Sequence, residues 1–538
     1  MTVSTRPRLP TPSVGDVVAG ISVALVLIPQ SLAYAEIAGV PPHVGLLAAG
    51  LPPLLAAPFT SSPYLQTGPV ALTSLLTFGA LSGLAATGSA EYVALAALLA
   101  VIVGVTRVLL GLLRMGTIAY LMSQPVVMGF TTSAAILIVA SQIPSLFGVD
   151  PETDGTLPRA WWTIVHPDRW QGAALALSIV GIVFVVGSRS IHRLFPGVLV
   201  VVVGATVWSG LSDYGGATLG DLPGGFVTLS LDLPYGEWTR LIVPGIVIAI
   251  VGFAEPAAIC RTFASQDRIP WNADKEFVGN GIANLASAVS GGFPVGGSFA
   301  RSSLSRIAGA TSIWTGAISG AIVLAALPLA PHLEPLPRAV LGAIVVTAVA
   351  GLIQPVAMLR IWPKSAPQGA IAAGTFVATL ATSPNVERGI IIGIVLSIGF
   401  HLYREMAVDY RYERRDDRVI VRPSGVVWFA STPALEDAFR NALAEHHTVR
   451  GITIDLASCG RLDYTGASAL ATEVSELAQA GYDIEFVNIP DHALRALAGA
   501  LGGTHDLPTL DDLPAETRFQ WVPPWRRSRR TGGITRER

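Results

Sequence analysis

Long stretches without a charged residue constrain this chain more than any other feature. No Asp, Glu, Lys or Arg occurs between Ile37 and Ala90. About a quarter of the residues in an average soluble domain are charged, so a soluble fold does not leave such a stretch empty. A helix that spans a bilayer needs about 20 consecutive, mostly apolar residues. The first part of the chain is therefore predicted to lie in a membrane.

Charge divides the chain into two blocks near His401. Residues 1–400 hold 35 of the 72 charged side chains, and residues 401–538 hold the other 37. The second block therefore has the charge density of a soluble domain. We predict a cytoplasmic lead over residues 1–13, a membrane domain over 14–403, a cytoplasmic domain over 404–524 and a basic, disordered tail over 525–538.

The composition excludes several classes of function. The net charge of −2 provides no basic footprint for nucleic acid. Cys260 and Cys459 fall in different blocks, so neither a disulfide framework nor a metal-ligand spacing is present. We expect no metal and no cofactor. The polar first residues lack the apolar core of a signal peptide and are expected to be cytoplasmic.

Apolar runs indicate about fourteen membrane segments. They lie near residues 17–35, 43–58, 69–85, 91–113, 117–147, 171–187, 195–211, 238–263, 277–291, 298–311, 313–330, 338–358, 366–382 and 386–403. The cations of the short loops lie at segment ends of one parity, which the positive-inside rule assigns to the cytoplasm. These cations are Arg107, Arg114, Arg189, Arg193, Arg268, Lys275, Arg360 and Lys364. We expect a multi-pass protein of the plasma (inner) membrane with both termini in the cytoplasm.

Two segments, residues 60–81 and 291–311, are interrupted by Pro, Gly and Ser. Extended backbone cannot face lipid, because its N–H and C=O groups would be unpaired. Each segment is therefore predicted to be an extended stretch inside the protein, followed by a half-helix. A helix with an internal proline, Pro29 or Pro256, precedes each one, and the pattern recurs after about 228 residues. An odd number of segments separates the copies, so the second is inverted, as in many transporters.

The two half-helices predict an anion site. They would begin near Pro69 and Ser298 and direct their N-termini at one point near the midplane. A helix N-terminus carries about half a positive charge and unpaired N–H donors. Since corresponding breaks in two repeats mark substrate sites, we interpret this pair as the site of an anion rather than as tolerated kinks.

Five further side chains are candidates for the site. Charged residues inside membrane segments are costly and mark ion pathways or structural ion pairs. Glu255 and Arg301 are predicted to pair; Arg301 would add charge to the anion site, and Glu255 would take up a proton or help to bind Na⁺. Glu36 lies near a segment end, where reaching the interface is as good an explanation as a secondary role. Gln30 and Tyr34 share one helix face and suit either anion contact or helix packing.

The second block alternates strand-like and helix-like patterns, which predicts a small α/β domain. Strands are expected over 418–423, 425–430, 451–457 and 483–489, and helices over 433–446, 465–481 and 491–501. No phosphate-binding loop and no nucleophile motif follows a strand. We expect a binding or regulatory module and no enzyme. The basic tail could touch anionic lipid headgroups, but a solvated tail is the simpler interpretation.

Five motifs, in order along the chain, resemble those of the sulfate permease (SulP) family of anion transporters, which includes pendrin and prestin. They are VALVLIPQSLAYAEIAGVPP (23–42), GPVALTSLL (68–76), VGFAEPAA (251–258), GGFPVGGSFARSSL (291–304) and, in the STAS domain that follows in this family, ITIDLASCGRLDYTGASAL (452–470). The resemblance implies fourteen segments in two inverted repeats of seven. Segments 1–4 and 8–11 form a core domain, and segments 5–7 and 12–14 form a gate domain that anchors a homodimer.

The resemblance also assigns roles to residues. Substrate contacts would come from Gln30, Tyr34, Val70, Ala71, Phe299, Ala300 and Arg301, and Glu255 would be the coupling carboxylate. Related anti-sigma-factor antagonists carry a phosphorylated Ser directly after the Asp of the STAS motif. Here Tyr464 follows Asp463, so Thr465 is the nearest regulatory candidate for a cytoplasmic partner.

The sequence therefore predicts a secondary active transporter of a small anion such as sulfate, bicarbonate or a dicarboxylate, coupled to H⁺. Na⁺-coupled bicarbonate symport and anion exchange stay open. Two further alternatives are a nucleobase symporter, which lacks a STAS domain, and a signalling or voltage-responsive membrane protein that does not transport.

Overall fold

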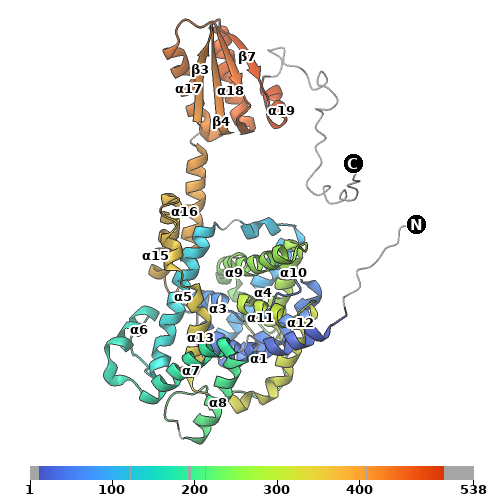
Figure 1. The fold of residues 1–538 in the computed structure, drawn as a ribbon, viewed down its shortest axis with the longest axis vertical. Coiled ribbons are helices and arrows are strands. Elements are labelled where there is room, and N and C mark those ends of the chain that lie inside the picture. The colour runs from blue at the N-terminus through green and yellow to red at the C-terminus, as the bar shows by residue number, and fades with distance from the viewer. Residues whose placement is uncertain (1–10, 121–122, 192–194, 213, 407–408, 502–538) are drawn as a thin grey trace, which may run out of the picture. The chain divides into compact units, whose positions relative to one another are not determined.

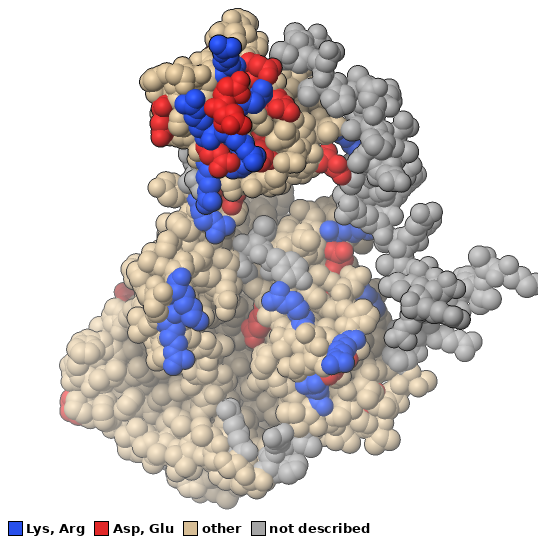
Figure 2. Space-filling view, turned by 45° about the horizontal axis from the view of Figure 1, so that its top comes forward, with Lys and Arg blue, Asp and Glu red and all other residues tan. Residues whose placement is uncertain are grey.

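The chain divides into a helical unit, Met1–Ser397, and a sheet-containing unit, Ile398–Arg538. The computed structural model describes residues 11–120, 123–191, 195–212, 214–406 and 409–501. Most of the predicted lead and the whole tail over 525–538 lie outside these residues. Charged side chains crowd the sheet-containing unit and are sparse on the helical unit in Figure 2.

Helices make up almost all regular structure of the first unit (Figure 1). They are α1 (Val14–Ala38), α2 (Pro42–Ala56), α3 (Ala71–Leu81), α4 (Ala90–Leu112), α5 (Gln124–Phe147), α6 (Thr156–Val165), α7 (Gly172–Ile191), α8 (Gly197–Leu211), α9 (Trp238–Asp267), α10 (Ala273–Val289), α11 (Phe299–Ile307), α12 (Trp314–Ala326), α13 (Arg338–Val349), α14 (Pro355–Leu359), α15 (Ala366–Ala381) and α16 (Val386–Met406). Two short strands, β1 (Thr67–Gly68) and β2 (Gly296–Gly297), pair with each other.

The polytopic helical fold is the predicted one. Every predicted apolar run coincides with a helix, and eight helices among the described residues are long and apolar enough to cross a membrane. Helices α3 and α11 have only 11 and 9 residues, as half-helices require. The number of fourteen segments stays a prediction, because several of the other helices are too short to cross alone.

The helices form two groups, which we call the core helices and the gate helices. The core helices are α1, α2, α3, α4, α9, α10, α11 and α12, and the gate helices are α5, α7, α8, α13 and α15. Glycines bring core helices together: a Cβ on Gly281 of α10 would lie 2.8 Å from the carbonyl oxygen of Gly104 in α4. Small residues permit such close packing where no hydrophobic effect drives helices together.

One prediction about segment ends is wrong. Arg107 was expected at the cytoplasmic end of its segment, but its side chain is completely buried among the core helices. Its guanidinium donates to three backbone carbonyl oxygens, so the residue is satisfied inside the protein and not in a loop.

The second unit is a small α/β domain. Its strands are β3 (Asp409–Arg415), β4 (Arg418–Val427), β5 (Gly451–Asp455), β6 (Cys459–Leu462) and β7 (Asp483–Val487), and its helices are α17 (Thr432–Glu445), α18 (Tyr464–Gln479) and α19 (Asp491–Ala500). The sheet order is β3-β4-β5-β7, with β6 beside β4; only β3 and β4 are antiparallel. The two strands predicted over 418–423 and 425–430 are instead one strand, β4, whose register shifts at Gly425.

Its core follows the alternation of the strands. Val419 and Val421 of β4 and Ile452 and Ile454 of β5 are buried against Phe439 of α17. Burying an aliphatic side chain of this size contributes about 1.5–3 kcal/mol. At the end of β5, Asp455 accepts hydrogen bonds from Asn488 and Arg422, and the Asn488 amide holds the pKa of this carboxyl below its usual range.

Candidate functional site

The two strands β1 and β2 cross at the centre of the core helices. They are antiparallel, with Thr67 opposite Gly297 and Gly68 opposite Gly296. Their backbone groups therefore pair with each other, which removes the cost of extended backbone in a membrane. A Cβ at Gly297 would lie 2.6 Å from Leu65 and 3.2 Å from Pro256, so a larger residue here would displace the Leu65 side chain.

A half-helix follows each strand directly. Helix α3 begins after Val70, which caps it with extended backbone and no side-chain hydrogen bond. Helix α11 begins after Ser298, whose hydroxyl accepts from the backbone N–H of Arg301 at 3.4 Å. Ser298 also donates its own N–H to the Gln66 carbonyl oxygen at 3.1 Å, and this bond continues the pairing of the two strands. Both half-helices thus start from one rigid crossing.

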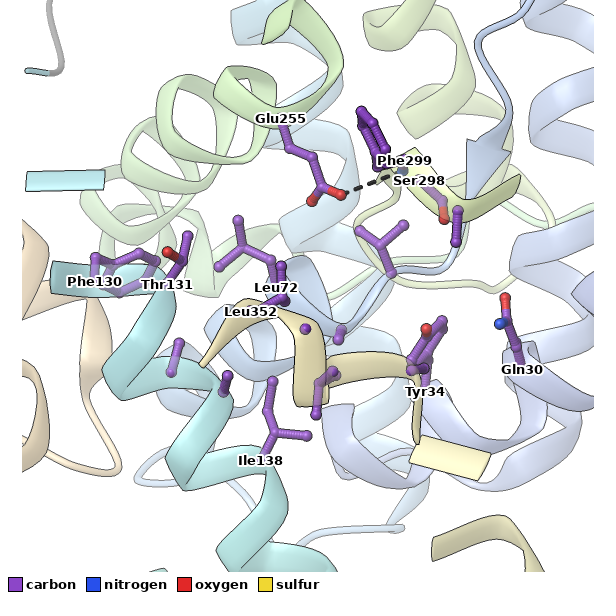
Figure 3. A pocket seen from close by; sticks show the side chains of 18 of the residues that line it. Gln30, Tyr34, Leu72, Phe130, Thr131, Ile138, Glu255, Ser298, Phe299 and Leu352 are labelled. Atoms are coloured by element: carbon purple, nitrogen blue, oxygen red, sulfur yellow. Dashed lines mark hydrogen bonds between the residues drawn. The ribbon is translucent and has the colours of Figure 1, made fainter. Parts of the chain in front are cut away.

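A cavity of about 570 Å³ opens at these two N-termini. Its core side is formed by Gln30, Tyr34, Val70, Ala71, Leu72, Glu255, Ser298, Phe299 and Ala300, among others. Its gate side includes Phe130, Thr131 and Ile138 of α5 and Ile344 and Thr347 of α13. Figure 3 shows Gln30 and Tyr34 on the side opposite Phe130 and Thr131. The lining is mostly apolar, with few polar groups, as small-molecule sites usually are.

Glu255 occupies the N-terminus of α11. Its Oε1 accepts the backbone N–H of Phe299, the first residue of that helix, at 3.4 Å (Figure 3). A helix N-terminus favours negative charge, so this carboxylate lies where an anion would be stabilised.

Arg301 lies behind the crossing. Its side chain is completely buried and is not part of the cavity lining. Its Nη2 donates to the Pro69 carbonyl oxygen at 2.9 Å, and its Nη1 donates to Gln30 Oε1 at 3.2 Å. The predicted ion pair with Glu255 is not formed, because these two acceptors hold the guanidinium while Glu255 contacts the backbone of Phe299.

Of the predicted site residues, the structure brings seven together around the cavity: Gln30, Tyr34, Val70, Ala71, Glu255, Phe299 and Ala300. Glu36 is not among the cavity residues; it lies 3.6 Å from Arg338, the first residue of α13. In the other unit, Thr465 is exposed near the start of α18. Sequence reasoning missed the gate residues Thr131 and Thr347, because uncharged residues in an apolar helix give no signal of their own.

No group of metal-ligating side chains is present in the described part of the chain.

Comparisons with known proteins identify the family of this chain. The model of the sulfate permease family matches residues 14–375, and that of the Mlab STAS domain matches residues 410–505. A probable sulfate transporter of Mycobacterium tuberculosis is 32% identical over 400 residues, which are 73% of this chain and 70% of that protein. The chloroplastic sulfate transporter 4.1 of Arabidopsis thaliana is 28% identical over 472 residues, which are 82% of this chain and 69% of that protein.

Two solved structures share the fold. The murine solute carrier 26 family member A9 anion transporter, described in its inward-facing state, superposes with a TM-score of 0.83 at 21% identity over 92% of this chain and 88% of that one. The transmembrane domain of the cyanobacterial bicarbonate transporter BicA superposes with a TM-score of 0.61 at 21% identity over 72% of this chain and 97% of that one. The relatives are named as transporters and not as enzymes. The chain therefore belongs to the sulfate permease family of anion transporters and carries a STAS domain.

Proposed function

We propose that this chain is a proton-coupled secondary transporter that binds a small anion between the N-termini of α3 and α11. The substrate contacts are assigned to Gln30, Tyr34, Val70, Ala71, Phe299 and Ala300, and Arg301 supports the site from behind. Sulfate, bicarbonate and dicarboxylates are the candidate substrates. The names of the relatives favour sulfate, and that of BicA favours bicarbonate.

The observation that carries the coupling is the hydrogen bond from Phe299 N–H to Glu255. When Glu255 is ionised, its carboxylate holds the N–H donor that an anion needs and repels the anion. Protonation removes the negative charge and weakens this hydrogen bond, so that an anion can compete for the donor. Proton and anion therefore bind together, and because linkage is reciprocal, acid pH also tightens anion binding.

Sodium coupling is the main alternative, since a carboxylate beside a cavity can also bind a cation. Glu255 lies on α9 and contacts the first residue of α11, and the buried guanidinium of Arg301 on α11 disfavours a second positive charge there. We therefore assign H⁺ rather than Na⁺. Exchange of one anion for another requires no coupling at Glu255 and is distinguished by the experiment below.

Alternating access follows from the position of the cavity between core and gate helices. The crossing and both half-helices belong to the core helices, so the site moves as one body when these helices shift against the gate. Most cavity residues of α5, including Phe130 and Thr131, lie in the first half of that helix, which the proposed topology places near the cytoplasm. An inward-facing state fits this lining.

The remaining assignments complete the proposal. Residues 14–403 form the transport domain of a plasma-membrane protein, residues 404–524 form a cytoplasmic STAS domain, and both termini are cytoplasmic. The gate helices join two copies in a homodimer. A cytoplasmic partner would bind the STAS domain near the start of α18, where Tyr464 is 74% exposed and Thr465 is also exposed.

Uptake into liposomes tests this function. Purified full-length protein is reconstituted into liposomes that are empty or preloaded with unlabelled anion. Labelled sulfate, bicarbonate and succinate are then offered under an inward pH gradient, an inward Na⁺ gradient, or neither. We expect concentrative uptake of one anion under the pH gradient alone. Strict dependence on Na⁺, or uptake only against a preloaded anion, contradicts proton symport, and absence of uptake in every arm contradicts the function itself.

A further inference from the structure

Arg107 of α4 is a buried cation that the site described above does not use. Its side chain has no solvent exposure. The guanidinium donates to the carbonyl oxygens of Ala249 at 3.0 Å, Val295 at 2.9 Å and Ile248 at 3.2 Å. Among the described residues no carboxylate lies within ion-pair distance of it. Burying a charge in a membrane protein is costly, so an unpaired buried arginine calls for an explanation.

Its position relates it directly to the crossing of β1 and β2. Gly68 is opposite Gly296, so Pro69, which follows Gly68, and Val295, which precedes Gly296, lie at the same end of this antiparallel pair. Arg301 donates to the carbonyl oxygen of Pro69, and Arg107 donates to that of Val295. Two guanidinium groups therefore hold the same end of the crossing, one on each strand.

The hydrogen-bonding needs of the Val295 peptide are met without Arg107. Asn284 of α10 donates Nδ2 to the Val295 carbonyl oxygen at 3.1 Å and accepts its N–H at Oδ1 at 2.9 Å. A neutral residue at position 107 would thus leave this peptide satisfied. The other carbonyls, of Ile248 and Ala249, lie inside helix α9. What Arg107 adds to the crossing is therefore chiefly its charge.

The charges near the crossing do not balance. Arg107 and Arg301 carry two positive charges, and Glu255 carries one negative charge at most. The next buried carboxylate on a neighbouring core helix is Glu276, two helical turns before Asn284 on α10, where it accepts the N–H groups of Ser61 and Ser62. The positive charge near the crossing therefore exceeds what would balance a monovalent anion. The excess is largest when Glu255 is protonated.

We propose that Arg107 is a second cation of the anion site, which acts from behind the crossing and selects dianions over monoanions. Val295 and Ser298, which lines the cavity, are three residue steps apart along extended backbone, a path of about 10 Å. In a low-dielectric interior, the charge of Arg107 attracts an anion at that distance without touching it. The inference rests on the proposed function and narrows its substrate class to doubly charged anions such as sulfate or a dicarboxylate.

The test measures the affinity of purified full-length protein for sulfate and nitrate by calorimetry, in the parent and in the Arg107→Gln, Arg107→Lys and Arg114→Gln variants. Glutamine keeps donors for the carbonyls without the charge, and lysine keeps the charge. Arg114, exposed just beyond α4, is the matched control for loss of one positive charge. For Arg107→Gln we expect sulfate affinity to fall about tenfold and nitrate affinity about threefold, because the field acts twice on a dianion.

The ratio of the two losses separates charge from structure. Equal losses for sulfate and nitrate in Arg107→Gln, or the same losses in Arg107→Lys, overturn the proposal, as does any comparable loss in Arg114→Gln. If Arg107→Gln does not fold, Arg107→Lys decides alone: the parent's sulfate-to-nitrate ratio supports the proposal, and a shifted ratio overturns it.

A fourth variant keeps this inference separate from the proposed function. Ala300→Trp fills the cavity at the start of α11. If it abolishes anion binding while Arg107→Gln binds both anions as the parent does, only the role of Arg107 is wrong. If Ala300→Trp binds sulfate as well as the parent, or the parent binds neither anion, the proposed site itself is wrong and the inference fails with it.

Discussion

The two halves of the site, β1–α3 and β2–α11, have the same backbone design but different chemistry. Each is a two-residue strand followed by a half-helix. Helix α3 has no charged residue and no side-chain cap at its start. Helix α11 is capped by Ser298, carries Arg301 and Arg306, and bonds its first N–H to Glu255. The backbone N–H groups at the start of α3 have no side-chain partner, whereas at the start of α11 Glu255 and Ser298 accept backbone N–H groups.

This difference indicates a division of labour within the repeat. The unpaired N–H groups at the start of α3 would attract any small anion, because a helix dipole interacts with the charge of an anion and not with its chemical identity. Under the proposed function, the first donor of α11 is available to an anion only when Glu255 is protonated. The backbone geometry therefore occurs in both halves, and the residues proposed for coupling occur only at α11.

Loss of Arg301 should produce the largest effect, because it removes the main cation of α11. Arg301→Ala leaves the Pro69 carbonyl and Gln30 without a buried donor, and an unsatisfied buried group costs about 1–3 kcal/mol. We expect transport to fall at least about 100-fold. Proteoliposome uptake measures this, with size-exclusion profiles to confirm folding and Arg301→Lys as the charge-preserving comparison. A parent-like rate and apparent affinity would remove Arg301 from the site.

Replacing Glu255 should make α11 behave as α3 does. Glu255→Gln imitates the protonated carboxyl: it removes the negative charge, and its neutral oxygen holds Phe299 N–H less strongly than a carboxylate does. We expect anion binding and exchange to persist and to lose their pH dependence, while accumulation driven by a pH gradient disappears. Glu36→Gln is the control: Glu36 is a partly buried glutamate that pairs with Arg338 outside the cavity, and this variant should still accumulate anion. The assignment fails if Glu255→Gln still responds fully to an imposed pH gradient.

The reverse change gives α3 a cap like that of α11. Val70→Thr adds a hydroxyl, with little change in shape, at the extended cap position of α3. The hydroxyl accepts one of the free N–H groups, and a cap of this kind is worth about 1 kcal/mol. We expect anion affinity to fall about fivefold. Val70→Ala removes volume without adding an acceptor and should bind more tightly than Val70→Thr; equal affinities would mean that the bare N–H groups of α3 do not bind the anion.

The smallest effect is expected from a change outside both halves. Removing residues 405–538 deletes the STAS domain, whereas every residue of the cavity lies before that point. We expect the purified truncation to bind the anion within about twofold of the parent, because the local contacts are unchanged. Binding and not transport is the measurement, because transport and abundance also depend on assembly. A folded truncation that binds no anion would place part of the site in the STAS domain.

Sequence patterns alone determined the layout of this protein. Charge-free stretches locate the membrane helices because lipid excludes charge regardless of how helices pack. The Pro, Gly and Ser breaks at 60–69 and 291–298 locate the half-helices because only buried, paired backbone can be extended there. The small α/β domain follows from alternating strand-like and helix-like patterns. These rules depend on local sequence and need no knowledge of neighbours, so Gln30, Tyr34 and Glu255 could be proposed from them. The resemblance to the sulfate permease family added the STAS assignment and the contacts Val70, Ala71, Phe299 and Ala300.

Only the tertiary structure decided which charges meet. Sequence position placed Arg107 at a helix end and paired Arg301 with Glu255. The structure instead directs both guanidinium groups to backbone carbonyls of the crossing. The partners of Arg107 lie 141 to 188 residues away along the chain. The partner of a side chain depends on how helices distant in sequence pack against each other. The periodicity of a sequence indicates which residues share a helix face, but it does not indicate what that face will contact.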